Sequence, residues 1–570
     1  MKKDVAQADP APAVESAAPE AIETEALEHT TEATQPVTES IEETEAPAEP
    51  LKPVNADEYK KAFGTLKSEN EGALGNRWWQ GQNAEFVLKA IRFLPEAPQS
   101  EMVRDLSRRV LLTKADPALL APAADAEMGI KLLQERLTKL VRLGLFDDAI
   151  GLYAELPQPA PDALLGPVTQ AMIGKNGLSQ ACIELKTNRS EQHDESVTSL
   201  KELETYCGYT LREGLSGKEA AQKYLTSKNI AASDFLSGDK AKNFSLLAFQ
   251  SWLEAGGTQN IPTEQNYWKQ LPTSFMAAGL NRLANIPPEK SLQLLTTAKR
   301  LNMISAYSAG THLKDITSAY FGGSQIPNSS DSLDTIGKFL FLNAKANSVK
   351  DVDLKQQYAS KAMDTTYGNN EVLIFPFLMP IMDDPIPADF SAEKAKKALE
   401  MVESMAWLDV DKAWITLVGG SYPEFNSYIL GSIFKGMERE STLSGPSNMS
   451  TKPLIYLSEY LDIVVKEVKK FRDSANLLNF PYEKYLDLTA ESSYVMPSKG
   501  IFDTLNQGVE TKSFGAVVLS SLLIIGNKSA IDLYTGLLHN VLTGLNNLGL
   551  TKEAEVLGEE ALLTLHKKGV

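Results

Sequence analysis

Two cysteines, Cys182 and Cys207, are the first candidates for chemistry in this chain. They lie in the segments LSQACIEL and LKELETYCGYTL, which both have helical periodicity. If the two helices are antiparallel with a turn near residues 192–195, the cysteines differ by roughly 3 Å in height, which a disulfide tolerates. If the first helix ends near Asn188, the mismatch grows and we expect no bridge. Two buried thiols are the alternative, and composition alone favours them.

The five histidines are scattered along the chain, at His29, His193, His312, His539 and His566. None is spaced with another histidine, a cysteine or a carboxylate as a zinc site requires, so we expect no metal. Two glycine-lysine stretches, 214–218 and 526–529, lack the glycine spacing of a phosphate-binding loop, and the sequence contains no Gly-x-Ser-x-Gly motif. We therefore expect no cofactor and no catalytic residue.

Arg77, Trp78 and Trp79 are the best candidates for a binding site, because arginine and tryptophan are residue types that dominate protein–protein interfaces. The alternative is that the two indoles cover the apolar end of the first helix pair, as the terminal unit of a helical array requires. A second pair, Trp407 and Trp414, is seven residues apart and shares a helix face. We expect that second pair in the core.

Much of the chain's charge is concentrated at its start. Residues 1–53 hold 13 acidic and 3 basic side chains, seven prolines and no aromatic residue. Such a segment cannot bury enough apolar surface to offset its ordering entropy, so we expect residues 1–55 to be a disordered acidic tail. Of the net charge of −18, the tail contributes −10 (3 − 13), which leaves −8 for the rest. With both signs mixed in the body, this balance predicts no binding to nucleic acid or anionic lipid.

Apolar stretches in the body are too short to cross a membrane. The longest, residues 514–525, has twelve residues including two serines, and it predicts a buried helix. The start, Met1-Lys2-Lys3, is followed by Asp4 and by no apolar stretch, so no leader peptide is expected and the chain would stay in the cytoplasm. A leader removed before this start would leave the same pattern.

Helical patterns extend over most of the body. Apolar residues recur at helical spacing in residues 86–94, 102–111, 130–141 and 146–153. Between the third and fourth of these, Gly144 suits the left-handed position that ends a helix. A similar Leu-Gly turn recurs at residues 548–549. These units resemble the helix-turn-helix units of tetratricopeptide-type repeats, although no fixed period of about 34 residues fits them.

The sequence therefore predicts an all-α protein, an irregular superhelical array of antiparallel helix hairpins stacked as an α-solenoid. We divide the body into an N-terminal helical-repeat region, 56–235, and a C-terminal helical region, 236–570. The segment EVLIFPFLMPIM, residues 371–382, is β-rich in composition, but two prolines interrupt it. We interpret it as a buried, proline-broken helical segment.

Residues 75–235 are similar to a little-studied family of alphaproteobacterial helical-repeat proteins. The resemblance rests on RDLSRRVLLTKADP (residues 104–117), the Leu-Gly turn at 143–144 and the two spaced cysteines, in this order. It implies an all-helical protein of the periplasm or cell envelope. It also makes a disulfide between Cys182 and Cys207 as well supported as two buried thiols.

The function that these patterns predict is a surface rather than a reaction centre. We expect a non-catalytic scaffold or adaptor that binds another protein along stacked helices. One alternative is an enzyme, for example a cell-wall lyase, whose site is formed by scattered helical residues. Close carboxylates with perturbed pKa values would favour that alternative. The other alternative is a structural component that self-assembles in the envelope.

Overall fold

The structure is a computed structural model that describes residues 55–188, 197–349 apart from 302, 305, 324, 325 and 328, then 354, 358 and 361, and finally 497–528, 535–554 and 556–558. The chain divides into two units, Met1–Pro50 and Leu51–Val570. All but the last residue of the predicted tail (1–55), the segment 371–382, and Trp407 and Trp414 lie outside the described residues. The elements below belong to the second unit.

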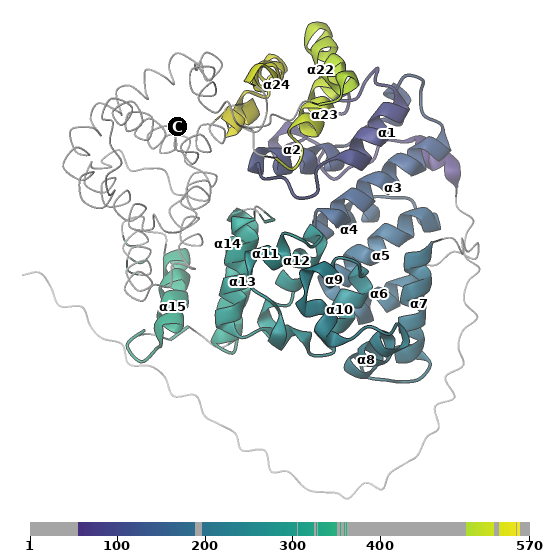
Figure 1. The fold of residues 1–570 in the computed structure, drawn as a ribbon. Helices are drawn as coiled ribbons and strands as arrows, with labels where there is room; N and C mark the ends of the chain where they lie inside the picture. Colours follow the sequence, from purple (N-terminus) through teal and green to yellow (C-terminus); the bar gives the residue numbers. More distant parts are fainter. Residues whose placement is uncertain are drawn as a thin grey trace, which may run out of the picture. The chain divides into compact units, whose positions relative to one another are not determined.

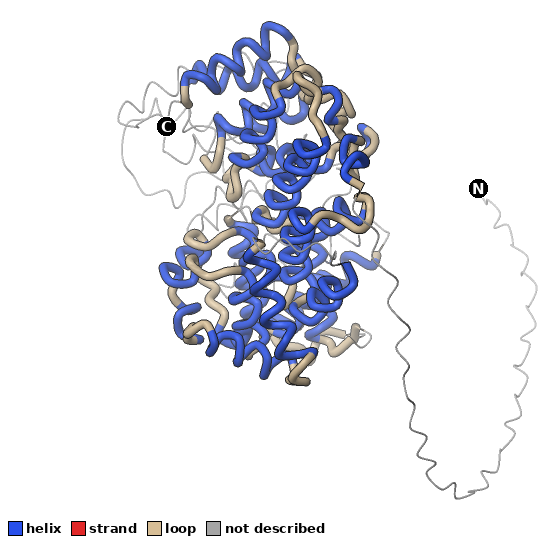
Figure 2. Tube along the Cα trace, turned by 90° about the vertical axis from the view of Figure 1, so that its right-hand side faces the viewer, coloured by secondary structure: helices blue, strands red, loops and turns tan. Residues whose placement is uncertain are grey.

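Helices make up the described part of this unit, as Figure 1 and Figure 2 show. In chain order they are η1 (Ala56–Lys60), η2 (Glu69–Glu71), α1 (Ala84–Phe93), α2 (Glu101–Leu112), η3 (Pro117–Leu119), α3 (Ala126–Arg142), α4 (Phe146–Ala154), α5 (Asp162–Asn176), α6 (Leu178–Asn188), α7 (Thr198–Leu211) and α8 (Gly217–Ser227). They continue with η4 (Ala232–Leu236), α9 (Gly238–Ala241), α10 (Leu246–Glu254), η5 (Gly257–Asn260), α11 (Gln265–Trp268), α12 (Thr273–Leu280), η6 (Leu283–Asn285), α13 (Pro288–Arg300), α14 (Ala306–Tyr320) and α15 (Thr335–Ser348). The last are α22 (Lys499–Thr511), α23 (Phe514–Ile525) and α24 (Thr535–Asn547).

The all-α prediction is confirmed for these residues. Their only β-type pairs are two isolated bridges, Phe63 with Ala115 and Leu66 with Thr113. No described helix combines the length and the apolar character that crossing a bilayer demands.

The first four α-helices follow the predicted apolar patterns, and side chains cap three of them. The Asn83 side chain accepts a hydrogen bond from the Phe86 amide, and Ser100 and Asp125 do the same at the starts of α2 and α3. Gly144 has a φ of 72°, as the Leu-Gly turn predicts. A side-chain carbon there would lie 2.5 Å from the Ala277 methyl group, so this turn packs directly on α12. The glycine therefore serves both the turn and the close approach.

A buried arginine attaches residues 63–66 to the helices behind them. Arg136 of α3 is 2% exposed, and its guanidinium donates to the backbone carbonyls of Leu111, Phe63 and Thr113 at 2.6, 3.0 and 3.1 Å. Burial lowers the pKa of Arg136 to about 10. The same charge thus satisfies three carbonyls at the point where the body begins.

Helix α5 lies at the centre of the described helices. It contacts α3, α4, α6, α7, α10 and α12, and apolar residues are buried along its whole length. In a regular solenoid each unit contacts only its neighbours. Here helices from both sides of residue 235 pack on one helix. The predicted boundary at residues 235/236 is therefore not a gap in packing.

The last described helices return to the first ones. Helix α23 packs against α22 and α24, and also against α1 and α2. Figure 1 shows α22 and α23, in yellow-green, next to α1 and α2, in purple and blue. Helix α23 is apolar over almost its entire length, and ten of its twelve residues are buried. The predicted buried helix at 514–525 is confirmed, and it fills a space that the N-terminal helices form.

Candidate functional site

The two tryptophans predicted to bind a partner are buried. They lie in the turn-rich segment 75–82 that leads into α1, with relative exposures of 2% for Trp78 and 1% for Trp79. Their ring centroids are 5.3 Å apart, and the Trp79 indole N–H donates to the Asp116 carbonyl at 2.8 Å. The neighbouring Arg77 is exposed. The two indoles therefore stabilise the end of the described N-terminal helices.

Helix α23 covers this tryptophan pair. A side-chain carbon at Gly515 would lie 2.8 Å from the Trp78 carbonyl oxygen and 3.1 Å from the Trp79 Cα atom. Beside it, the Gln82 amide donates to the Ser513 hydroxyl at 2.6 Å. Because the chain itself occupies this surface, a partner could reach the indoles only if α23 moved. Binding at Arg77, Trp78 and Trp79 thus stays a prediction.

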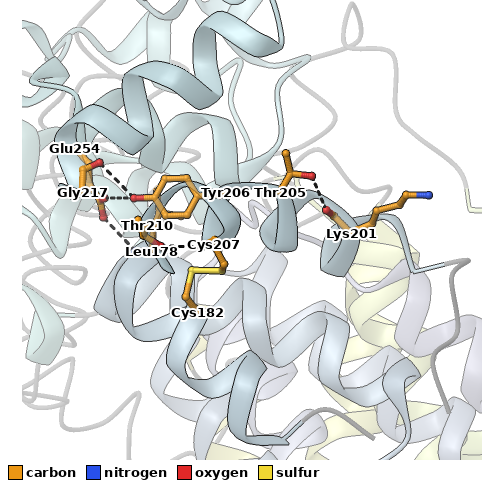
Figure 3. The surroundings of a disulfide bond; sticks show 9 residues. All are labelled: Leu178, Cys182, Lys201, Thr205, Tyr206, Cys207, Thr210, Gly217 and Glu254. Carbon is orange, nitrogen blue, oxygen red and sulfur yellow. Dashed lines mark hydrogen bonds between the residues drawn. A yellow bond between two sulfur atoms is a disulfide. The ribbon is translucent and has the colours of Figure 1, made fainter. Parts of the chain in front are cut away.

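The two cysteines form a disulfide between α6 and α7, shown in Figure 3. Their Cα atoms are 5.5 Å apart, and both side chains are buried. Helix α6 ends at Asn188, the case in which we expected no bridge; that expectation was wrong. It treated the connection as a tight turn, but nine residues, 189–197, separate the two helices. At about 3.3 Å per residue, this connection can absorb the difference in height.

A glutamate ties the disulfide-linked helices to the residues beyond them. The Glu254 carboxylate, at the end of α10, accepts from the Leu178 amide at 3.1 Å, the Tyr206 hydroxyl at 3.2 Å and the Arg282 guanidinium at 3.1 Å. Figure 3 shows the Tyr206 hydroxyl facing both this carboxylate and the Gly217 carbonyl, to which it donates at 3.2 and 3.3 Å. Burial, followed by the charge of Glu254, raises the pKa of Tyr206. The sequence did not predict this cluster of hydrogen bonds, because Leu178, Tyr206, Glu254 and Arg282 are about 25 to 100 residues apart.

Charged side chains line one face of α2 at helical spacing. We call Glu101, Arg104, Asp105 and Arg108 the α2 charged face; it lies opposite the buried Val103 and Val110. Arg108 binds the Asp148 carboxylate of α4 through two hydrogen bonds of 2.6 and 2.7 Å. Burial lowers the pKa of Arg104 to about 10. The charges of this face recur at positions i, i+3, i+4 and i+7, a signal in the sequence that none of the predictions above used.

The carboxylate of Asp105 on this face has a shifted pKa. Its side chain is 58% exposed, yet the surrounding chain desolvates the carboxylate and raises its pKa. Arg109 and Arg108 oppose the rise, whereas the negative charges of Glu553 and Glu101 add to it. Arg109 is shared, since it contacts Asp105 at 3.8 Å and pairs closely with Glu553 near the end of the chain. The site can therefore bind charged groups or hold a proton.

The histidines form no such centre in the described part of the chain. His312 of α14 lies 3.9 Å from the Asp315 carboxylate, and burial lowers its pKa. His539 is on α24, and His29, His193 and His566 lie outside the described residues. Within the described ranges, no three histidine, cysteine or acidic side chains are grouped so that they could hold a metal ion.

No protein-family model, curated protein or solved structure matches this chain. The resemblance of residues 75–235 to alphaproteobacterial helical-repeat proteins thus stays a prediction.

Proposed function

We propose that the protein is a non-catalytic scaffold or adaptor that binds another protein through the α2 charged face. The observation that carries this proposal is the alternation of charge along the face, from Glu101 to Arg108, with Asp148 beside it. Two of its members remain accessible, since the side chains of Asp105 and Arg108 are 58% and 38% exposed. A face that alternates in sign complements another protein segment of mixed charge better than it complements a polyanion.

The helix arrangement supports a repeat-like scaffold. Successive helices contact each other in the pairs α3–α4, α5–α6, α7–α8 and α13–α14. We propose that these pairs are the hairpins of an irregular superhelical array, with α5 buried between several of them. Stacked hairpins expose extended surfaces on which a helix or peptide docks.

The disulfide supports a location in the periplasm or cell envelope. Disulfides persist in oxidising compartments and are rare in the cytosol. The Cys182–Cys207 bridge has the Cα separation that native disulfides have. We therefore propose export, and we place the protein partner in the same compartment.

Charge reversal at Asp105 tests the binding proposal. The full-length protein is used to capture its partner from native cells, and the captured protein is then purified for binding isotherms. We expect Asp105→Lys to weaken the affinity at least tenfold, about 1.4 kcal/mol, because it places a like charge opposite the partner's cation. The matched control is Asp239→Lys at the start of α9, where Asp239 is 79% exposed and pairs with Lys242. Equal affinities of both variants would exclude the α2 charged face as the interface.

Acid–base catalysis is the second candidate, because the raised pKa of Asp105 beside Glu553 is the kind of perturbation that catalytic carboxylates have. This alternative includes the cleavage of cell-wall polymers. Asp105→Asn keeps the shape of the side chain but removes its ability to act as a general acid or base. If the purified protein turns over any substrate and Asp105→Asn abolishes that turnover without a loss of fold, the scaffold proposal is wrong.

A further inference from the structure

The disulfide between α6 and α7 is shielded from solvent. Cys182 is 2% exposed and Cys207 is 6% exposed. A disulfide is reduced when a thiolate attacks one of its sulfur atoms, so the rate of reduction depends on access to that atom. Because so little of either cysteine is exposed, α6 or α7 must move before a thiolate can attack. The contacts that hold these two helices therefore determine how readily the bridge is reduced.

Helix α6 is held at its first residue by a side chain from another helix. The Leu178 amide donates to Glu254 Oε1 at 3.1 Å, which satisfies one of the backbone N–H groups that the start of a helix leaves without a partner. The preceding residue, Gly177, has no side chain that could cap the helix, and a Cβ atom there would lie 3.0 Å from the same oxygen. Leu178 lies about one helical turn before Cys182, so this contact holds the end of α6 that carries the cysteine.

Helix α7 is held by the other oxygen of the same carboxylate. Tyr206 lies next to Cys207, and its hydroxyl donates to Glu254 Oε2 at 3.2 Å, with the Gly217 carbonyl as a second acceptor at 3.3 Å (Figure 3). The tyrosine ring is fully buried and lies edge-on to Tyr224 of α8. A movement of this turn of α7 that exposes the sulfur of Cys207 therefore has to break the hydrogen bond to Glu254.

Arg282 fixes the position of the carboxylate. Its guanidinium donates to Glu254 Oε1 at 3.1 Å, and the side chains of Arg282 and Glu254 are only 19% and 18% exposed. Hydrogen bonds to an ionised acceptor are stronger than those between neutral groups. Glu254 thus gives strong hydrogen bonds to both helices that carry the cysteines.

We propose that the Glu254 carboxylate controls reduction of the Cys182–Cys207 bridge, which reacts with a dithiol only after Leu178 or Tyr206 has left this carboxylate. In that reaction a thiolate of the dithiol attacks one cysteine sulfur and the bond between the cysteines breaks. The second thiolate of the dithiol then closes its own disulfide, so the bridge gains the two electrons and two protons that the dithiol loses. The proposal does not depend on the proposed scaffold function, since it concerns only the redox state of the chain itself.

The rate of reduction of the oxidised full-length protein tests this proposal. Dithiothreitol is the probe, and the thiols that form are trapped at intervals with an alkylating agent and counted by mass spectrometry. We expect Tyr206→Phe to raise the rate about tenfold, because it removes only the hydroxyl and its hydrogen bond to a charged group. Tyr267→Phe in α11 is the matched control. Tyr267 is also buried, but its hydroxyl donates to the Phe235 carbonyl at 2.6 Å, so the rate should stay unchanged.

A second variant removes the carboxylate itself. Glu254→Ala takes the acceptor away from both helices and should raise the rate more than Tyr206→Phe does. Its control is Glu213→Ala, just after α7, because this carboxylate is 43% exposed and pairs with Lys223 of α8. Urea denaturation of each variant shows whether it is folded under the conditions of the assay.

Three results would overturn the proposal. The first is reduction of the folded wild type as fast as in concentrated urea, a comparison that needs no variant. The second is a rate for Glu254→Ala equal to that of the wild type. The third is equal acceleration by Tyr206→Phe and Tyr267→Phe, which would show that the bridge is reached by unfolding of the whole protein and not by local release from Glu254.

Discussion

The disulfide between α6 and α7 and the docking of α23 on α1 and α2 both join separate helices, but by different means. The first is covalent and links residues 25 positions apart. The second is non-covalent and links Gln82 to Ser513, 431 positions away. Both are buried, and both are accompanied by polar contacts at their edges: Tyr206 and Glu254 near the disulfide, Arg109 and Glu553 near the docked helix.

The two contacts stabilise the folded protein by different physical means. A disulfide acts largely by restricting the unfolded chain, so its contribution depends on loop length and on the redox state. A docked apolar helix acts through close packing in the folded state, so its contribution depends on shape. A reductant should therefore weaken only the first contact, and a change of side-chain volume only the second.

The largest expected effect is on the packed contact. Replacing Trp79 with alanine removes a side chain that is 1% exposed and breaks its hydrogen bond to Asp116. We expect the free energy of unfolding to fall by roughly 3–5 kcal/mol. The neighbouring Arg77→Ala is the control, and as an exposed position it should change stability by no more than about 0.5 kcal/mol. Urea denaturation of both variants would show equal midpoints if the indole were not part of the core.

The covalent contact should respond somewhat less. Replacing Cys182 and Cys207 with alanine opens a loop of 25 residues, which the chain-entropy model puts at roughly 3 kcal/mol. A reductant should lower the melting temperature of the wild type and leave that of the double variant unchanged. Non-reducing digestion and mass spectrometry check the bond itself. Two thiols that react with an alkylating agent before reduction would contradict the bridge and favour a cytoplasmic location.

A smaller effect on stability is expected at the α2 charged face, which belongs to neither of these two contacts. In the folded protein the pKa of Asp105 is raised above 3.8, the ordinary pKa of an aspartate in an unfolded chain. The folded protein therefore holds this proton more tightly. This residue's contribution is therefore fully present below pH 3.8 and is lost as the pH rises through the higher folded pKa. Asp105→Asn should remove this loss and stabilise the protein at neutral pH by less than about 1 kcal/mol, since the side chain is solvent-screened. Melts from pH 4 to pH 8 would reject this reasoning if the variant were less stable than the wild type at pH 7.

The smallest expected effect concerns the acidic tail. Deletion of residues 1–53 should change the melting temperature by no more than about two degrees, since the segment has no apolar anchors. A longer deletion, of residues 1–67, is the contrasting variant. It also removes Tyr59, which is fully buried and donates its hydroxyl to the Pro157 carbonyl at 3.0 Å, and it should destabilise the protein clearly. A large loss from the shorter deletion would show that the tail binds the body.

The sequence predicts the local features of this structure well. Periodicity locates α1 to α4, and Gly144 marks its turn, because these signals depend on residues within about four positions of each other. Periodicity alone does not predict the disulfide. The heights at which the two cysteines meet depend on the connection between α6 and α7, and periodicity does not determine the length of that connection. The packing of α23 on α1, α2 and the tryptophan segment could not be predicted from the sequence. The glycine at 515 looks like any other residue of an apolar run until the tryptophan backbone is placed beside it.

The position of Gly515 has a consequence for synthesis on the ribosome. Trp78 and Trp79 emerge early, but the helix that covers them is made about 430 residues later. At about 5–20 residues per second, the nascent chain carries this uncovered apolar surface for roughly 20 to 90 s. Aggregation during translation is therefore most favoured in that interval, and a chaperone that shields the tryptophan segment until α23 is complete should raise the yield of folded protein.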